Sequence, residues 1–96
     1  MSARIERSLL CIRRQVPDQH EEAYRELWGE LARRVGQSGS HAWRFRAPAD
    51  GTERLEFLEF EAAQDPREDE LARGLMERLD REIGVADQAR DVALDR

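Results

Sequence analysis

The residues best suited to chemistry in this sequence are His41, Trp43 and Phe45, which alternate along one short segment. In an extended strand, residues two apart point to the same side, so these three side chains are expected to form one row. A histidine beside aromatic rings can accept or donate a proton near neutral pH. The row therefore predicts the wall of a pocket with a proton acceptor. The alternative is a solvated strand-end histidine beside two core aromatics.

Two more candidates precede this segment. Cys11 and Arg13 share one face of an earlier apolar segment, and a cysteine becomes reactive only in an accessible, electropositive setting such as Arg13 could supply. Tyr24 and Trp28 lie on the apolar stripe of a predicted helix. Trp28 could close the same pocket from above, and Tyr24 could aim its hydroxyl into a cavity. The alternatives are a small buried cysteine, ordinary helix–sheet packing, and a tyrosine hydroxyl that reaches the surface from the edge of the core.

These residues define the predicted site. His41 is the expected proton acceptor, and Arg13 is expected to stabilise a developing anion. The expected substrate-binding residues are Trp43, Trp28, Tyr24, Phe45 and Cys11. No metal site is predicted, because His20 and the acids beside it do not offer enough convergent ligands. No cofactor is predicted either.

A second charged pattern lies on the other face of the same segment. Arg44 and Arg46 are expected to point away from His41. They could form cross-strand ion pairs with Glu56 or Glu59, or they could bind an acidic ligand. Both interpretations stay open.

The elements that must position these residues follow from hydrophobic periodicity. Residues 8–16 predict a first strand. A capping box of Asp18 and Glu21 is expected to begin a helix that runs to about Val35, with Gly36 and Gly39 forming its left-handed exit. Residues 41–46 and 53–61 alternate on both sides of a Pro- and Gly-containing turn, which predicts a β-hairpin.

A second helix is expected to begin at Asp65, with Pro66 in its first turn, and to end at Gly84. Its apolar stripe is expected to comprise Leu71, Leu75, Met76, Leu79 and Ile83. Residues 85–96 are an uncertain tail that fits either a short helix or a short strand.

The third predicted strand has apolar residues on both faces. Leu55 and Phe57 point one way, and Leu58 and Phe60 point the other. Either a bulge shifts the register or both faces are buried, one of them against a partner subunit. We favour the second interpretation, because the first strand has the same two-sided character.

The length and composition of the chain limit the classes of function that are expected. The 96 residues predict one domain, residues 1–96. The net charge of −5 disfavours nucleic acid. There is no lysine for a Schiff base and no asparagine to orient a reacting group. The single cysteine, and the lack of a signal-peptide pattern or a long apolar run, predict a cytoplasmic protein that does not cross a membrane.

The order β-α-β-β-α(β) predicts an α+β sandwich, with an antiparallel sheet and both helices on one face. In its aliphatic first strand, its glycine-led second strand and its Leu58–Glu59–Phe60–Glu61 segment, the chain resembles the antibiotic biosynthesis monooxygenase-like family. The resemblance covers roughly residues 8–83. It implies a ferredoxin-like fold of the dimeric α/β-barrel form, with facing sheets and a pocket between each sheet and its helices. The family's Asn and second-helix His are missing from this sequence.

Three functions are compared. The first is a homodimer, joined through its sheet, that binds an apolar or aromatic small molecule and, if catalytic, oxidises or isomerises it without a cofactor. The second is a non-catalytic dimeric interaction or regulatory module, whose pocket would be filled by its own side chains. The third, an RNA-binding domain, is disfavoured by the acidic balance.

Overall fold

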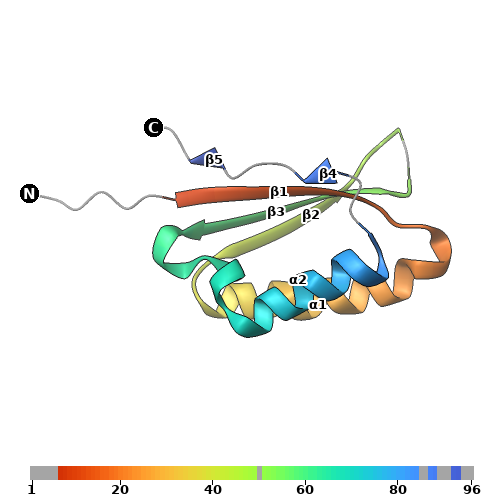
Figure 1. Ribbon diagram of the computed structural model, residues 1–96. Coiled ribbons are helices and arrows are strands. Elements are labelled where there is room, and N and C mark those ends of the chain that lie inside the picture. Colours follow the sequence, from red (N-terminus) through yellow and green to blue (C-terminus); the bar gives the residue numbers. More distant parts are fainter. Residues whose placement is uncertain (1–6, 50, 85–86, 89–91, 94–96) are drawn as a thin grey trace, which may run out of the picture.

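The computed structural model describes residues 7–49, 51–84, 87–88 and 92–93 of the chain. Its elements, in chain order, are β1 (Arg7–Gln15), η1 (Asp18–His20), α1 (Glu21–Gln37), β2 (His41–Arg46), β3 (Glu53–Glu61), η2 (Ala62–Gln64), η3 (Pro66–Glu68), α2 (Glu70–Glu82), β4 (Asp87–Gln88) and β5 (Val92–Ala93). The helices α1 and α2 lie side by side against one face of the sheet (Figure 1). This confirms the predicted antiparallel α+β plan with helices on one face.

The sheet has the strand order β2-β3-β1-β4, and β5 also pairs with β1. Every pairing is antiparallel. The predicted hairpin of β2 and β3 is therefore confirmed, as is the pairing of the first and third strands. In the tail that the sequence left undecided, the described segments Asp87–Gln88 and Val92–Ala93 are short strands rather than a helix.

The strand β3 keeps one unbroken register with β1 from Glu53 to Glu61, so there is no bulge in it. Its residues alternate between buried and half-buried along its whole length. The side chains of Leu58 and Phe60 are buried on the helix side, while Leu55 and Phe57 are half-buried on the other side. The structure thus supports the interpretation that β3 has two apolar faces.

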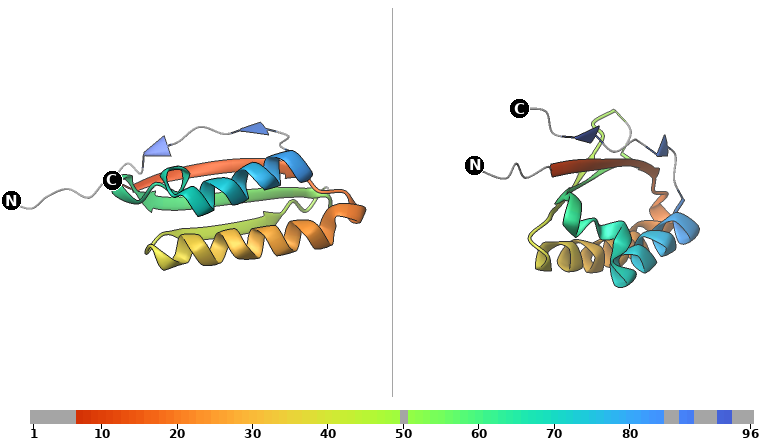
Figure 2. Two further views of the ribbon diagram at one scale, coloured as in Figure 1. Left: turned by 60° about the horizontal axis from the view of Figure 1, so that its bottom comes forward. Right: turned by 60° about the vertical axis from the view of Figure 1, so that its left-hand side comes forward.

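The hydrophobic core fills the layer between the sheet and the helices. It is built from Leu10, Ile12, Val16, Tyr24, Leu27, Trp28, Leu31, Val35, Leu58, Phe60, Ala72 and Leu79. Figure 2 shows the two helices covering the same side of the sheet from two further directions. No described helix is long and apolar enough to cross a membrane.

The start of α1 differs from the prediction. Asp18 does not cap the helix with its side chain; it begins the short 3-10 turn η1, and α1 starts at Glu21 without a side-chain cap. The capping-box prediction is therefore wrong. At the other end, Gly36 lies inside α1, and of these two glycines only Gly39 has the left-handed backbone, with φ of 81°. A residue with a side chain is strained there, which explains the glycine.

The helix α2 also begins later in the chain than the sequence predicts. The Asp65 side chain accepts a hydrogen bond from the Arg67 N–H, but this caps only the 3-10 turn η3. The true N-cap is Asp69, whose carboxylate accepts from the Ala72 N–H. Of the expected apolar stripe, Leu79 is buried, and Leu75, Met76 and Ile83 pack against the core. Leu71 is 62% exposed, and Ala72 is buried in its place.

Asp69 gives a pH prediction. The Arg34 side chain hydrogen-bonds both of its oxygens, and this lowers the pKa of Asp69 to about 2. Because the folded pKa lies below the unfolded value, this contribution is present above about pH 4 and is lost as the pH falls towards 2. We expect the midpoint temperature of thermal unfolding to fall less steeply in Asp69→Asn than in the wild type as the pH is lowered from about 4 to about 2. Equal slopes would show that Asp69 does not contribute.

Candidate functional site

The candidate site is the sheet face that points away from the helices, here called the open face. The strand register arranges its side chains in three rows across β2, β3 and β1. The rows are His41–Glu59–Leu9, Trp43–Phe57–Cys11 and Phe45–Leu55–Arg13. Five of the seven predicted site residues therefore share one surface: His41, Trp43, Phe45, Cys11 and Arg13.

Aromatic rings dominate the β2 side of the open face. The His41 imidazole stacks on the Trp43 indole, with ring centroids 5.6 Å apart and planes 4° apart. Phe45 meets Phe57 edge to face at 5.7 Å. Trp43 is 45% exposed and Phe45 is 55% exposed. Such an apolar group is unusual on a free surface and is typical of a binding site.

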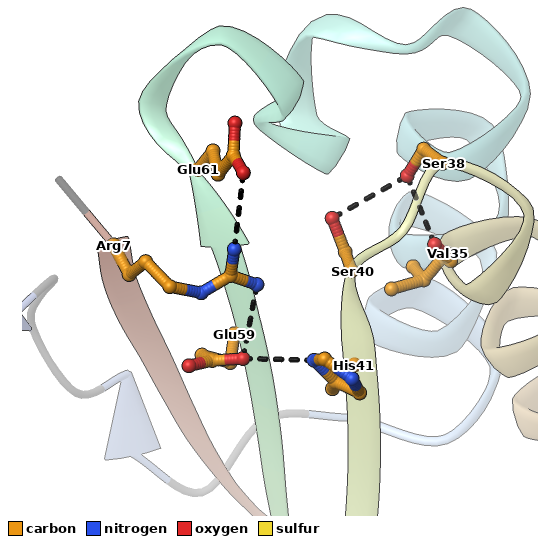
Figure 3. Close-up of polar contacts among 7 residues, drawn as sticks. All are labelled: Arg7, Val35, Ser38, Ser40, His41, Glu59 and Glu61. Carbon is orange, nitrogen blue, oxygen red and sulfur yellow. Dashed lines mark hydrogen bonds and ion pairs between the residues drawn. The ribbon is translucent and has the colours of Figure 1, made fainter. Parts of the chain in front are cut away.

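His41 belongs to a chain of polar contacts at one end of the open face (Figure 3). Its Nδ1 lies 2.8 Å from a Glu59 oxygen, and Arg7 donates to the same oxygen from 3.1 Å. Arg7 also donates to Glu61 at 3.3 Å. The hydrogen bond from Arg7 lowers the pKa of Glu59, which keeps this carboxylate charged beside the imidazole.

This geometry suits an imidazole that exchanges a proton with a ligand. A carboxylate at Nδ1 orients the ring, as in other histidines that act as bases. No contact between Nε2 of His41 and another described residue is seen, so this nitrogen can face a ligand stacked beside Trp43. The arrangement places an imidazole nitrogen and an exposed indole side by side on one surface.

Cys11 and Arg13 are less suited to chemistry on the open face than His41 and Trp43 are. Burial raises the pKa of the Cys11 thiol, which disfavours the reactive thiolate. Arg13 lies in the row farthest from His41, two strands away, with its Nε 3.8 Å from Glu53. Four residues along a strand and two strands across amount to roughly 16 Å between backbones. Within one chain, the two predicted catalytic residues do not converge on one atom.

The remaining predicted residues lie on the other side of the sheet. Tyr24 and Trp28 are buried in the core between α1 and the sheet. The prediction that Trp28 closes the same pocket as Trp43 is therefore wrong within one chain. The layer between sheet and helices, where the resemblance implies a pocket, is filled by the protein's own side chains.

The sequence analysis missed a buried polar network in this layer. Arg14 is 0% exposed and Glu56 is 1% exposed. The Arg14 Nε donates to both Glu56 oxygens, at 3.0 and 2.9 Å, and the Tyr24 hydroxyl donates to Glu56 at 2.8 Å. The Arg14 Nη1 donates to Asp80 and to the Gly84 carbonyl, both at 2.9 Å. Burial raises the pKa of Glu56, and Arg14 and Tyr24 oppose that effect.

The sequence carried a signal for this network. Arg14 and Glu56 stand at positions that share a strand face with Ile12 and Leu58, where an apolar residue is expected. A charged residue in such a position is buried only with a partner of opposite charge. Because Arg14 and Tyr24 occupy the Glu56 carboxylate, and Glu59 faces the other way, the ion pairs expected for Arg44 and Arg46 do not form with these acids. Arg44 instead lies over the Tyr24 ring, 5.5 Å from its centroid.

A separate surface cavity of about 360 Å³ lies at the end of α1. It is lined by Arg34, Val35, Gln37, Ser38, Ala63, Gln64, Asp65, Pro66, Glu68, Asp69 and Ala72. Its carboxylates at 65 and 69 are already bonded to Arg67 and Arg34. The Ser38 hydroxyl on its rim donates to the Val35 carbonyl (Figure 3). None of the predicted site residues lines this cavity.

The described residues contain no group of three or more His, Cys, Asp or Glu that could hold a metal ion.

In the comparisons with known proteins, no protein-family model and no curated protein matches the sequence. Solved structures do match. A protein from Nitrosomonas europaea, provisionally named an antibiotic biosynthesis monooxygenase, superposes with a TM-score of 0.69 at 11% identity, over 100% of this chain and 95% of that one.

A second structure named antibiotic biosynthesis monooxygenase superposes with a TM-score of 0.68 at 14% identity, over 94% of this chain and 97% of that one. The designed protein Ferredog-Diesel superposes with a TM-score of 0.55 at 16% identity, over 99% of this chain and 90% of that one. At these identities the likeness shows the fold alone. The chain therefore has a ferredoxin-like α+β fold, the fold of solved structures that carry the name antibiotic biosynthesis monooxygenase.

Proposed function

We propose that the protein is a homodimeric domain that binds an aromatic small molecule on its open face, beside Trp43 and His41. The observation that carries this proposal is the exposed His41–Trp43 stack with a charged carboxylate behind the imidazole. A flat aromatic ring gains stacking energy on the indole, on the order of 0.5–1.5 kcal/mol beyond its burial. A phenolic hydroxyl on such a ligand would reach Nε2 of His41.

If the site is catalytic, the reaction that its groups suit is oxidation of an electron-rich aromatic compound by dioxygen. In the balanced form, a ring CH₂ group and O₂ give a ring carbonyl and water. His41 would accept the proton that leaves the carbon, and Glu59 would stabilise the resulting imidazolium. Arg13, at the far corner, would contact only the other end of a long ligand.

The partner in this proposal is a second copy of the chain, with the two open faces packed together as in a dimeric α/β barrel. The reason is the exposed apolar surface of Trp43 and Phe45, flanked by half-buried Leu55 and Phe57. A face of this kind is costly to leave in water, and a small domain gains stability from covering it. The ligand site would then lie between the two sheets.

The second candidate function is a non-catalytic dimeric interaction or regulatory module. One observation favours it: the layer between the sheet and the helices holds no space for a ligand among the buried side chains of Tyr24, Leu31, Leu58 and Leu79, each at most 1% exposed. In that case the open face would serve only for assembly.

Tryptophan fluorescence separates the two functions, because Trp43 is exposed and Trp28 is buried. We expect saturable quenching by polycyclic phenols or quinones in the wild type and in Trp28→Phe, and its loss in Trp43→Phe. Haem in the same panel tests a larger flat ligand. Circular dichroism checks that both variants fold. A flat response across the panel would exclude the small-molecule function and leave the interaction module, and oxygen uptake would be measured only with a ligand that binds.

A further inference from the structure

The structure also presents a free sheet edge with positive charge on β2. This strand is the outermost in the order β2-β3-β1-β4, and no described strand pairs with its outer side. Figure 2 shows β2 at the margin of the sheet, next to α1. An unpaired edge offers a row of N–H and C=O groups to another extended chain.

The register shows which backbone groups are free. The Ala47 N–H donates to the Glu53 carbonyl at 3.1 Å, so these residues form a hydrogen-bonded pair. Such pairs alternate along an antiparallel ladder, and residues 45, 43 and 41 are therefore the ones bonded to β3. The N–H and C=O groups of Ala42, Arg44 and Arg46 point to the outer edge.

The side chains at this edge set its charge. Arg44 and Arg46 lie on the helix-side face of β2, and Arg46 is exposed. Neither has an ion pair with another residue in the described parts of the chain. Across the sheet, Arg46 is next to Arg54, which is next to Arg14, so a row of arginines ends at the edge. Within this row, Arg14 is bonded to Glu56 and Arg54 is bonded to Glu21.

We propose that the β2 edge binds an extended acidic peptide by strand addition. Residues of the added strand opposite Arg44 and Arg46 would be acidic, and the residue between them would be apolar and pack beside Phe45 on the open face. The recognised pattern is therefore acidic–apolar–acidic. Backbone hydrogen bonds supply the affinity, and the alternate side chains supply the specificity.

A second copy of β2 is a poorer occupant of this edge. Antiparallel pairing of β2 with itself would place arginines of the two copies close together, and like charges on neighbouring strands destabilise pairing. The protein's net charge of −5 does not forbid an acidic partner. Charges beyond about 8 Å are largely screened at physiological ionic strength, so the arginines at the edge dominate at contact.

The test uses a fluorescein-labelled peptide of sequence Thr-Val-Glu-Val-Glu-Val-Thr and the full chain, followed by fluorescence anisotropy. We expect saturable binding that weakens roughly tenfold in Arg46→Glu, from the loss of one attraction and the gain of one repulsion. The matched control is Arg33→Glu, an exposed arginine on α1, away from the edge. It changes the net charge by the same amount as Arg46→Glu. It should leave the affinity within about twofold, because charges away from the bound peptide are screened.

Two peptide variants and a hydrogen-exchange measurement identify the binding mode. In an antiparallel added strand, the glutamates opposite Arg44 and Arg46 donate the backbone hydrogen bonds, so the same peptide with both glutamates N-methylated should not bind. The peptide with Lys in place of Glu should bind at least tenfold more weakly. Hydrogen exchange should show new protection of the amides of Ala42, Arg44 and Arg46 with the peptide bound. The proposal is overturned if the peptide does not bind, if N-methylation has no effect, or if Arg33→Glu weakens binding as much as Arg46→Glu. Concentration-dependent protection of these amides without peptide would also overturn it, since the occupant would then be a second copy.

Discussion

Replacing Arg14 with Met is expected to lower the free energy of unfolding by about 3–5 kcal/mol. The side chain is fully buried, and its loss leaves the Glu56 carboxylate in the core with the Tyr24 hydroxyl as its remaining partner. An uncompensated buried charge costs far more than the ion pair contributes. The loss is also a large share of the total, because domains of this size are stable by about 5–15 kcal/mol. Urea unfolding followed by circular dichroism measures it.

Two companion variants test the cause. Arg14→Met combined with Glu56→Leu removes both charges, and its stability should return to near that of the wild type. Tyr24→Phe removes one hydrogen bond to a charged group and should cost only about 1.5–3 kcal/mol. If the double variant is as unstable as the single one, the packing of Arg14 matters rather than its charge. If Arg14→Met costs less than about 1 kcal/mol, the network is not buried as described.

Replacing Phe45 with Glu is expected to raise the dissociation constant of the proposed dimer at least about a hundredfold. Phe45 is 55% exposed in the single chain, so the change costs the fold of one subunit little. In a dimer whose open faces meet, the new carboxylate would be buried without a partner, which costs several kcal/mol. Sedimentation equilibrium of the wild type and the variant measures the difference.

The control is Leu71→Glu. Leu71 is another large, exposed hydrophobic residue, but it lies on α2 and not on the open face. This variant should dimerise as the wild type does. Dimerisation that survives Phe45→Glu unchanged would show that the open face is not the interface. A wild type that stays monomeric at high protein concentration would also remove the dimer from the proposed function.

Local patterning determined most of the architecture. The alternation in residues 41–46 and 53–61, with a turn between them, specified the hairpin, because side chains of a strand point alternately to opposite faces. The same alternation placed His41, Trp43 and Phe45 in one row, as the structure has them. The stripe of Tyr24, Leu27, Trp28, Leu31 and Val35 specified the buried side of α1.

The ends of the helices were less determined. Several acidic residues near the start of each helix could serve as its N-cap, and the local sequence does not decide among them. Asp69 became the cap of α2, and Arg34 of α1 bonds the same carboxylate. The choice therefore depends on the packing of α1 against α2, which is a long-range contact.

The site depended most on tertiary structure. The sequence identified the aromatic residues, but only the strand order placed Glu59 beside His41, and only the position of α1 assigned Trp28 and Tyr24 to the opposite face. The partners of Arg14 come from a strand 42 residues away and from the end of α2. Periodicity reports which face a side chain occupies. Which charges meet across the core is decided by how the elements pack, because that alone brings residues distant in the chain within hydrogen-bonding distance.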